Sequence, residues 1–469
     1  MQKPSKSGHG KYKKSNQNTT NQTKDSKEFM RRLGTCMQLL DFNDESKQTQ
    51  EKAERLKALQ ELQDIIASPQ MMTNIVMPNL EHVVSMIKRN IFRPLPVVKK
   101  QGLAGETPME EEEVIIDPSW PHLQPVYEFF LQLIINESVD MKSLRSFITH
   151  KFIQEFLELF DSEEPKEREY LKNILHRLYA KLVPRRKMIR KAMADTFNAL
   201  IHENYKFNGT SELQDILASI ISGFAVPLRE EHNVFFHSII IPLHKVQTCH
   251  KFHNELLRCS MLFLSKEPNL AFPLIKGLMQ YWPFANYTKE TLFLGELLDI
   301  LEVCCDMAKL EPLVPRIFKR IVKCIASPHL QVSDRTMCFF EHEFFLNILK
   351  NFKHIAFPIL VPVISHLASN HWHKLILESL CALRNIIRDI DPTLYDKYAN
   401  DKNSPYLYLV KDPDSLKEDR AEIEAKWDIL TEKAVSQHKS FQKPVVPYRD
   451  SHIVGKNNGL DNGDVLFVD

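Results

Sequence analysis

The stretch Val314-Pro-Arg-Ile-Phe-Lys-Arg-Ile-Val-Lys-Cys-Ile325 shows most clearly how this chain folds. Its apolar side chains recur at intervals of three and four residues, at Val314, Ile317, Phe318, Ile321, Val322 and Ile325. This spacing places all of them on one face of an α-helix. The other face carries four cations: Arg316, Lys319, Arg320 and Lys323. The pattern therefore predicts an amphipathic helix over residues 314–325.

Helices of this kind repeat along the chain at a nearly constant interval. Pro273, Pro315 and Pro358 each begin an apolar helical stretch, and they are separated by 42 and 43 residues. Proline suits the first turn of a helix because the N–H that it lacks would have no partner there. A period of about 40–47 residues with two helices per unit is typical of HEAT and armadillo arrays. Because one helix pair cannot bury its apolar face alone, we expect the units to stack.

The composition favours the same class. Glycine accounts for only 12 of the 469 residues, whereas about 7% is usual. Glycine supplies the phosphate-binding loops of nucleotide and dinucleotide folds, so its scarcity argues against those folds. No stretch shows sustained alternation of apolar and polar residues, and we predict essentially no sheet. The predicted fold is an all-α, HEAT-like or armadillo-type solenoid of helical hairpins, an α-α superhelix.

The chain divides into four predicted regions. Residues 1–28 are basic and polar with almost no apolar content, so we expect a disordered tail. Residues 29–400 form the predicted repeat solenoid, with room for about eight units. Residues 401–439 are expected to be a C-terminal helical extension, and residues 440–469 a second disordered tail. An acidic loop at 107–113 interrupts the first part of the solenoid.

Charge, cysteine usage and hydropathy limit the partners and the compartment. Lys+Arg number 61 and Asp+Glu 60, a net charge of +1, whereas general nucleic-acid binders carry a basic excess. The eight cysteines include no Cys-x-x-Cys pair, as expected in a reducing compartment. The longest apolar stretch, 355–368, is interrupted by Pro358 and Pro362 and is too short to span a membrane. We expect a soluble cytoplasmic and nuclear protein that binds no nucleic acid and inserts into no membrane.

The sequence contains no strong catalytic motif, and we predict that the protein is not an enzyme and uses no cofactor. Two groups of residues resemble metal ligands: Cys249, His250 and His253, and His371 with His373. Neither group has a second ligand pair that would complete a tetrahedral zinc site. We interpret these histidines as residues on turns or helix surfaces and predict no metal site.

Several long phrases resemble a known family. They are Asp117-Pro-Ser-Trp-Pro-His-Leu-Gln-Pro-Val-Tyr127, Glu164-Pro-Lys-Glu-Arg-Glu-Tyr170, Leu175-His-Arg-Leu-Tyr179, Ile220-Ile-Ser-Gly-Phe-Ala-Val-Pro-Leu228, Gly277-Leu-Met-Gln-Tyr-Trp-Pro283, Phe293-Leu-Gly-Glu-Leu297 and Ser327-Pro-His-Leu-Gln-Val332. Together they resemble the B-prime regulatory subunits of protein phosphatase 2A, from about residue 30 to about residue 430.

The resemblance implies both a fold and a role. The family has HEAT-like repeats, in agreement with the period of the prolines. Its members bind the scaffold subunit and the catalytic subunit of a heterotrimeric phosphatase and select the phosphoproteins that are dephosphorylated. The metals and the phosphoryl chemistry belong to the catalytic subunit. The alternative from another class is a free-standing helical-repeat scaffold or transport adaptor without phosphatase partners.

Members of this family also hold short substrate segments of the form Leu-x-x-Ile-x-Glu in a groove. The resemblance carries nine groove positions onto His176, Arg177, Tyr179, Arg186, Asp215, Ile216, Ile220, Arg229 and His232. In this interpretation the isoleucines and Tyr179 form apolar pockets, and the arginines pair with the segment's glutamate or with a phosphate. By pattern alone, Ile216 and Ile220 would be core residues, and Arg177 and Arg186 would be solvated surface.

Some positions depart from the family pattern. Asp215 stands where glutamate is usual, and the phrase 338–344 lacks the usual tryptophan. Pro184 replaces a turn glycine, so we expect the helix 166–182 to end at Leu182 or Val183 and Arg186 to fall in the first turn of the next helix. The loop with Asp161, Glu163 and Glu164 resembles an acidic family loop that faces the catalytic subunit.

Overall fold

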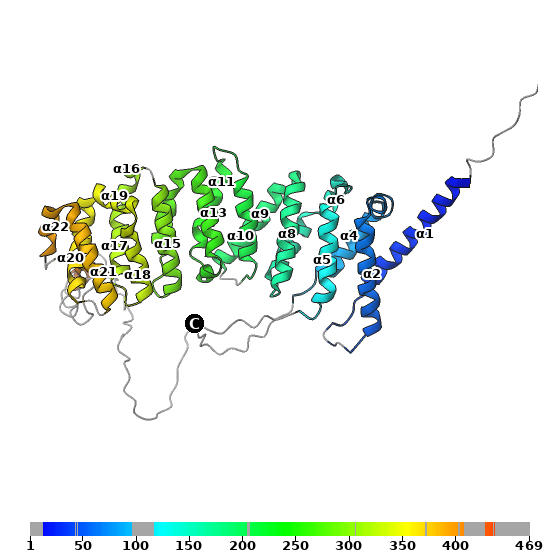
Figure 1. Cartoon of the computed structure of the whole chain (residues 1–469), viewed down its shortest axis with the longest axis horizontal. Coiled ribbons are helices and arrows are strands. Elements are labelled where there is room, and N and C mark those ends of the chain that lie inside the picture. Colours follow the sequence, from blue (N-terminus) through cyan, green and yellow to red (C-terminus); the bar gives the residue numbers. More distant parts are fainter. Residues whose placement is uncertain are drawn as a thin grey trace, which may run out of the picture. The chain divides into compact units, whose positions relative to one another are not determined.

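The computed structural model describes residues 13–42, 44, 46–95, 117–203, 207–304, 306–370, 373–401, 404–407, 427–434 and 436. The chain comprises two units, Met1–Asp401 and Lys402–Asp469. All regular structure in the described ranges is helical, and these ranges contain no strand (Figure 1). The predicted all-α class is therefore confirmed.

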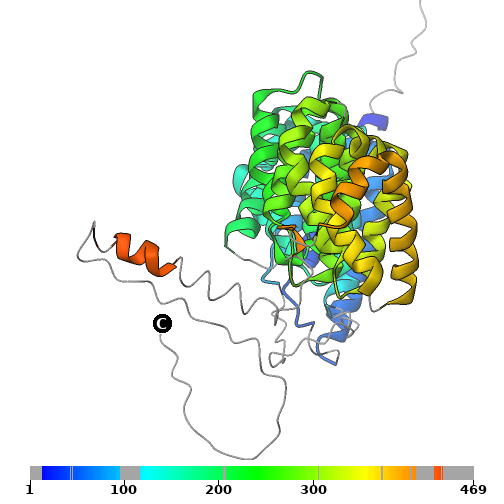
Figure 2. The same cartoon turned by 90° about the vertical axis from the view of Figure 1, so that its left-hand side faces the viewer.

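The long helices of the first unit form two layers, and each layer is a row of helices (Figures 1 and 2). We call one row the front layer. It consists of α2 (Thr49–Ala67), α5 (Trp120–Ile135), α8 (Pro165–Lys181), α10 (Thr210–Ser222), α13 (His253–Lys266), α15 (Tyr287–Val303), α18 (Leu330–Met337) and α21 (Lys374–Ile390). Each of these helices contacts the next one in the row. Helices α8, α10 and α13 begin 45 and 43 residues apart, close to the period found from the prolines.

The second row, the back layer, alternates with the first along the chain. It consists of α4 (Leu80–Ile91), α7 (His150–Glu158), α9 (Arg186–His202), α11 (Glu230–Phe235) continued by η5 (Phe236–Ile240) and α12 (Ile241–Leu243), α14 (Ala271–Gln280), α17 (Val314–Ile325) and α20 (Lys353–Asn370). From α7 onward, each back-layer member contacts the next. Since each front helix is followed by a back helix, the unit is a stack of helix pairs, as expected for a solenoid.

Helix α1 (Lys13–Cys36), which has 24 residues, precedes the two rows. Shorter elements complete the first unit: α3 (Pro69–Met71), η1 (Met72–Val76), η2 (Met77–Asn79), α6 (Met141–Phe147), η3 (Leu159–Asp161), η4 (Val183–Arg185), η6 (Gln247–Lys251), η7 (Pro268–Leu270), α16 (Met307–Leu310), η8 (Glu311–Leu313), η9 (Cys338–Glu341), α19 (Glu343–Asn351) and α22 (Pro392–Ala399). In the second unit, residues 427–434 are helical.

Helix α17 shows how the sequence pattern becomes packing. The six apolar residues of the predicted stripe are each at most 2% exposed. They face α14, α18 and α20, which all contact α17. Burying one such side chain stabilises the fold by about 1.5–3 kcal/mol, so the stripe is enough to hold the helix between its neighbours. The prediction of a helix over 314–325 is confirmed.

The prediction for Pro358 is wrong. Helix α20 begins at Lys353, so Pro358 and Pro362 lie inside the helix instead of opening it. The first turn forms one turn earlier, where the Ala356 N–H donates to the Phe352 carbonyl at 2.9 Å. A proline at 358 leaves the carbonyl of His354 without its helical donor. Because His354 is exposed, water can take the place of that donor.

The N-terminal tail also differs from expectation. Helix α1 covers Lys13–Cys36, so residues 13–28 are helical where we predicted disorder. Phe29, Leu33 and Cys36 are fully buried, and α1 contacts α2 and α4. A helix anchored at one end extends at low cost, because each further residue adds a hydrogen bond without a new nucleation step. Residues 1–12, 107–113 and 440–469 lie outside the described ranges.

Close packing in the back layer gives a test of the fold. A Cβ on Gly277 of α14 would overlap the Cγ2 methyl group of Ile241 on α12, whereas a Cβ on Gly34 of α1 would meet nothing within 4 Å. We expect Gly277→Ala to destabilise the protein by about 1–3 kcal/mol through overpacking. Gly34→Ala, the control, should stabilise it by about 0.5–1 kcal/mol because alanine favours a helix. Thermal denaturation of both variants measures the difference, and equal melting temperatures would contradict the packing.

Candidate functional site

The nine predicted groove residues lie on neighbouring elements. His176, Arg177 and Tyr179 are on the last two turns of α8, and Arg186 is the first residue of α9. Asp215, Ile216 and Ile220 are on α10, which contacts α8. Arg229 is the N-cap of α11, and His232 follows within that helix. Most of these residues therefore lie where the front helices end and the back helices begin.

Arg186 is fixed by the end of α8. Its Nε donates to the Tyr179 carbonyl at 3.0 Å, and its Nη2 donates to the Ala180 carbonyl at 3.0 Å. Its guanidinium carbon lies 5.2 Å from the centre of the Tyr179 ring. These carbonyls belong to the last turn of the helix, where they lack helical donors and where a cation is favoured. Helix α8 ends at Lys181 with Leu182 as its C-cap, one residue before the earlier of the two predicted ends, Leu182 and Val183.

A further arginine, Arg190, belongs to the same cluster and was not predicted. Its Nη1 donates to the Tyr179 hydroxyl at 3.1 Å, and its Nη2 lies 3.4 Å from Glu231 Oε1. Arg190 is four residues after Arg186, so both side chains lie on one face of α9. This spacing is the one signal in the sequence that could have pointed to it. We call Arg186, Arg190 and Arg229, with Tyr179, the arginine cluster.

Glu231 is the carboxylate that the arginine cluster already holds. It lies 3.4 Å from Arg190, 3.9 Å from Arg229 and 3.6 Å from His232 Nε2. The side chain of Arg229 is 77% exposed, so its ion pair with Glu231 is a weak surface pair. The arrangement shows that the cluster can accommodate a carboxylate.

His232 is a neutral member of this region. Its ring stacks on Phe224 at 3.7 Å between centroids with an interplanar angle of 4°, and it is 8% exposed. Burial lowers the pKa of His232, and the cations Arg190 and Arg229 lower it further, against the opposing effect of Glu231. A neutral imidazole can donate one hydrogen bond to a carboxylate, but it adds no positive charge.

The two isoleucines differ from the expectation of open pockets. Ile216 is 2% exposed and Ile220 is 5% exposed. Helix α10 lies between α8 and α13, so residues four apart on its inner face are covered from both sides. In this state Ile216 and Ile220 are core residues, and they offer at most the floor of a pocket.

The remaining groove residues are more accessible. Asp215 lies 3.4 Å from Lys172 of α8 and 3.2 Å from Arg258 of α13, so it links three successive front helices. His176 and Arg177 are exposed. Within the described ranges, the side chain of Arg177 has no ion pair or hydrogen bond. Its charge is therefore available to a ligand.

The predicted acidic loop lies at the opposite end of α8. Glu164 is 5% exposed, and its carboxylate caps α8 by accepting from the Lys166 N–H at 3.2 Å. Asp161 Oδ1 accepts from the Asn208 N–H at 2.9 Å, which ties the turn before α8 to the turn before α10. Glu163 is exposed. Since α8 has 17 residues, the acidic loop and the arginine cluster are separated by roughly 25 Å of helix.

A buried ionic network supports the start of α8. Arg93 donates to Glu167 at 2.7 Å and to Asp117 at 2.7 Å, and Tyr127 donates to Glu167 at 2.6 Å. Burial of Asp117 would raise its pKa, but hydrogen bonds from Ser119 and Arg93 outweigh this effect and lower it. Arg93 and Asp117 are 24 residues apart in the chain, so the network links two separate described segments to α8.

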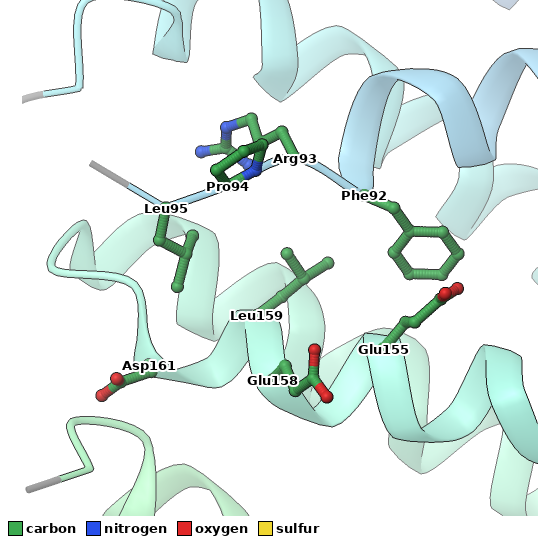
Figure 3. A pocket seen from close by; sticks show the side chains of 8 residues that line it. All are labelled: Phe92, Arg93, Pro94, Leu95, Glu155, Glu158, Leu159 and Asp161. Atoms are coloured by element: carbon green, nitrogen blue, oxygen red, sulfur yellow. The ribbon is translucent and has the colours of Figure 1, made fainter. Parts of the chain in front are cut away.

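A pocket of about 530 Å³ opens next to this network (Figure 3). Figure 3 shows its walls: Phe92, Arg93, Pro94, Leu95, Glu155, Glu158, Leu159 and Asp161. The segment 92–95 contributes three apolar side chains and Arg93, and the opposite side carries three carboxylates together with Leu159. Of the predicted site residues it includes only Asp161, and it contains no nucleophile next to a base. The pocket gives no indication of catalysis.

A second buried network contradicts one prediction. Glu296 of α15 is fully buried, and its carboxylate lies 3.1 Å from His244 Nε2 and 2.8 Å from His253 Nε2. We expected His253 on a turn or a helix surface, but it is 2% exposed and lies at the start of α13. Its Nε2 faces a buried carboxylate on the neighbouring front helix, and this partner offsets the cost of burying the polar ring.

The described ranges hold neither a metal-binding group nor a single membrane-spanning helix. No group of three or more His, Cys, Asp or Glu residues in these ranges is arranged to hold a metal ion. His371 lies outside those ranges. No single described helix is long and apolar enough to cross a membrane, although α19 and α20 together meet the criteria of length and composition with a bend of 107° between them.

The fold and the site define a class: a helical-repeat protein that gathers cations from three elements at one edge, without a catalytic constellation in its described part. A family model described as protein phosphatase 2A regulatory B subunit (B56 family) matches residues 14–434. The chain therefore belongs to the B56 family of regulatory B subunits of protein phosphatase 2A. It is a regulatory protein and not the catalytic subunit.

Individual relatives agree with this assignment. The B′ beta isoform of the 57 kDa regulatory subunit from Arabidopsis thaliana is 38% identical over 371 residues, which cover 79% of this chain and 74% of the relative. The 59 kDa B′ gamma isoform of the same plant is 34% identical, and the match covers 92% of this chain and 81% of the relative. The delta 1 isoform of the 56 kDa regulatory subunit from Schizosaccharomyces pombe is 34% identical, with coverage of 86% and 71%.

A solved structure of an engineered protein aligns with 81% of this chain and 97% of its own chain at 11% identity. Its TM-score of 0.26 is too low to support a conclusion about the fold. Membership of the family rests on the sequence relatives, and the architecture rests on the helices described above.

Proposed function

We propose that this chain is the substrate-recruiting member of a heterotrimeric protein phosphatase 2A, attached to a scaffold subunit and a catalytic subunit. Its arginine cluster binds Leu-x-x-Ile-x-Glu segments of substrate proteins. The observation that carries this proposal is that Arg186 and Arg190 both contact Tyr179, while Glu231 links Arg190 to Arg229 and Arg177 is exposed on α8. Guanidinium groups suit the glutamate and any phosphate of such a segment because they pair with both oxygens at once.

The dimensions of the region suit a short extended segment. Neighbouring helices pack about 8–10 Å apart, and an extended chain advances about 3.3 Å per residue. A six-residue segment therefore reaches from α8 across α10 to the loop that carries Arg229. Lys266 of α13 supports that loop, since its Nζ donates to the Phe224 carbonyl at 2.8 Å. The segment's apolar side chains would lie over Tyr179, with Ile216 and Ile220 beneath.

In this proposal only one residue of the acidic loop contacts the catalytic subunit. Glu163 is the exposed carboxylate that contacts the catalytic subunit, whereas Asp161 and Glu164 hold the turn in shape. The complex works in the cytoplasm and the nucleus, where its phosphoprotein substrates are found. No residue of this chain takes part in the phosphoryl transfer.

Copurification from a native extract tests the assembly. We expect the full chain to recover a scaffold subunit and a catalytic subunit in equal amounts, and the complex to dephosphorylate a phosphopeptide that the chain alone leaves unchanged. Recovery of neither subunit would support the free-standing scaffold or transport adaptor instead. Phosphatase activity of the isolated chain would contradict the assignment of catalysis to another subunit.

Removal of the internal carboxylate should tighten peptide binding. Glu231→Gln frees Arg190 and Arg229 from their present partner, so an acidic peptide no longer competes with it. We expect the Kd of a Leu-x-x-Ile-x-Glu peptide to fall about two- to fivefold, because surface ion pairs contribute roughly 0.5–1 kcal/mol. Isothermal titration calorimetry at low salt measures the change.

The matched control is Glu230→Gln, an equal change of charge at the preceding exposed residue, which has no ion pair among the described residues. If both variants tighten binding equally, only the overall charge matters and Glu231 does not occupy the site. The difference between the two should also shrink as salt is added, because exposed charges are screened.

A further inference from the structure

Exposed apolar side chains lie near the loop where α14 leads into α15. Phe284 is 77% exposed, Tyr287 is 43% exposed and Leu330 is 38% exposed. Tyr287 stacks on His329 with 4.0 Å between ring centroids, which brings the start of α18 to the start of α15. We call Phe284, Tyr287, His329 and Leu330 the aromatic ledge. Exposed apolar groups of this kind mark interaction sites when they are clustered.

Arg320 of α17 lies against the same loop. Its guanidinium carbon is 4.7 Å from the centre of the Phe284 ring and 5.2 Å from that of Trp282. Trp282 is held in place because its indole N–H donates to Glu290 at 2.7 Å. Arg320 is half-buried, and within the described ranges it has no ion pair and no hydrogen bond. The fold thus holds a guanidinium on two rings without an ion pair in the described ranges; Glu290 acts on Arg320 electrostatically, but its carboxylate accepts from the Trp282 indole.

Two further cations lie on α17, one on each side of Arg320 in the sequence. Arg316 and Lys323 are exposed, and neither has an ion pair among the described residues. At intervals of four and three residues the three side chains share one face of the helix and extend over about 10 Å. The apolar stripe of the same helix is buried, so this cationic face is the one that α17 presents to the surroundings.

We propose that the aromatic ledge and the cationic row of α17 form a docking surface for an acidic extended segment of another protein. Carboxylates of the segment pair with Arg316, Arg320 and Lys323, and an apolar side chain between them covers Phe284. An extended segment of three or four residues matches the length of the row, at about 3.3 Å per residue. The three cations favour a segment that carries carboxylates, because the charges are complementary. The exposed ring of Phe284 favours a segment with an apolar side chain next to those carboxylates.

Nucleic acid and anionic membranes are less suitable occupants of this surface. Duplex DNA binding draws on about six to ten phosphate contacts in typical cases, whereas this row offers three cations. The net charge of the whole chain is only +1, so no wider basic field adds to it.

The test uses the full chain and a fluorescein-labelled peptide, Glu-Asp-Leu-Glu-Asp-Phe-Glu, measured by fluorescence anisotropy. We expect binding that weakens at least tenfold in Phe284→Ala and in Arg320→Glu. The control is Lys350→Glu, an exposed cation of α19 outside the row, which should leave the affinity within about twofold. If Arg320→Glu does not fold, the double variant Arg316→Glu with Lys323→Glu changes only exposed residues and gives the same readout.

Equal affinity of the wild type and the ledge variants would overturn the proposal, and so would a wild type that does not bind the peptide. A third overturning result is binding of a 20-base-pair DNA duplex or of phosphatidylserine vesicles in place of the peptide. Competition separates this surface from the arginine cluster: a Leu-x-x-Ile-x-Glu peptide should not displace the acidic probe. Displacement would place the probe in the other site and overturn the assignment to the ledge.

Discussion

Glu296→Ala is expected to lower the free energy of unfolding around α15 by about 3–5 kcal/mol, because it leaves buried histidines without their counter-charge. Glu296 is fully buried, and its two oxygens are shared between His244 and His253. These residues stand on α15, next to α12 and at the start of α13. The loss should therefore spread over two adjacent helix pairs and not remain in one turn.

The geometry shows why the pair is charged. His244 Nδ1 lies 3.0 Å from the Ile241 carbonyl, and His244 Nε2 lies 3.1 Å from Glu296. With Glu296 ionised both partners are acceptors, and an imidazole that donates to both of them is positive. Burial alone would lower the pKa of His244, but the attraction of Glu296 and its hydrogen bond raise it. The same attraction lowers the pKa of Glu296 to about 2, against the effect of its burial.

Hydrogen exchange of the backbone amides in α13 and α15 measures this loss, because opening in a repeat protein is local. Glu296→Gln should cost less than Glu296→Ala, since an amide can accept from one histidine and donate to the other once both are neutral. Glu302→Gln is the control, because Glu302 is an exposed carboxylate further along α15. Equal exchange in Glu296→Ala and Glu302→Gln would show that the network is not a source of stability.

Stability should depend on pH with a definite sign. The pKa of Glu296 is lowered from 4.5 to about 2, so its contribution is present above pH 4.5 and disappears as the pH falls toward 2. The pKa of His244 is raised from 6.5, so its contribution is complete below pH 6.5 and is lost as the pH rises through the folded value. We expect maximal protection of α15 between these limits and a flatter profile in Glu296→Gln. Identical profiles in both proteins would contradict the charged pair.

The helices were more predictable than this network, and the reason is physical. The stripe from Val314 to Ile325 depends only on local periodicity, and every residue in it is buried as predicted. Glu296 occurs in an equally regular helix, but its partners lie 52 and 43 residues earlier in the chain. Periodicity identifies which face is buried, whereas the pairing of two buried polar groups depends on how the repeats stack.

The candidate site shows the same difference between local signals, which the sequence reveals, and long-range contacts, which it does not. The end of α8 and the position of Arg186 followed from Pro184, a local constraint on the backbone. Family resemblance brought Ile216 and Ile220 into the groove, whereas their spacing indicated core, and both are almost fully buried. Arg190 was not predicted because its one signal, the interval of four residues from Arg186, is common on the polar face of a helix. Its place in the cluster depends on its contacts with Tyr179 and Glu231, which lie on other elements.

Arg186→Glu is expected to weaken binding of a Leu-x-x-Ile-x-Glu peptide by roughly 30-fold to several thousand-fold, that is, by about 2–5 kcal/mol. The substitution removes a guanidinium that two carbonyls of α8 and the Tyr179 ring hold in place. It also puts a carboxylate beside the peptide's own glutamate. Isothermal titration calorimetry gives the affinity, and circular dichroism should show unchanged helix content, because loss of this charge at the helix end costs only about 0.3–1 kcal/mol.

Lys187→Glu separates a specific contact from a general effect of charge. Lys187 is the next residue of α9 and is exposed, so the net charge changes equally while the arginine cluster stays intact. A peptide whose glutamate is replaced by lysine adds a second criterion, because it should bind Arg186→Glu better than it binds the wild type. If the two variants lose affinity equally, the cluster acts only as a diffuse positive field. If neither loses any, Arg186 serves only to hold the end of α8, and the substrate segment must bind elsewhere on the solenoid.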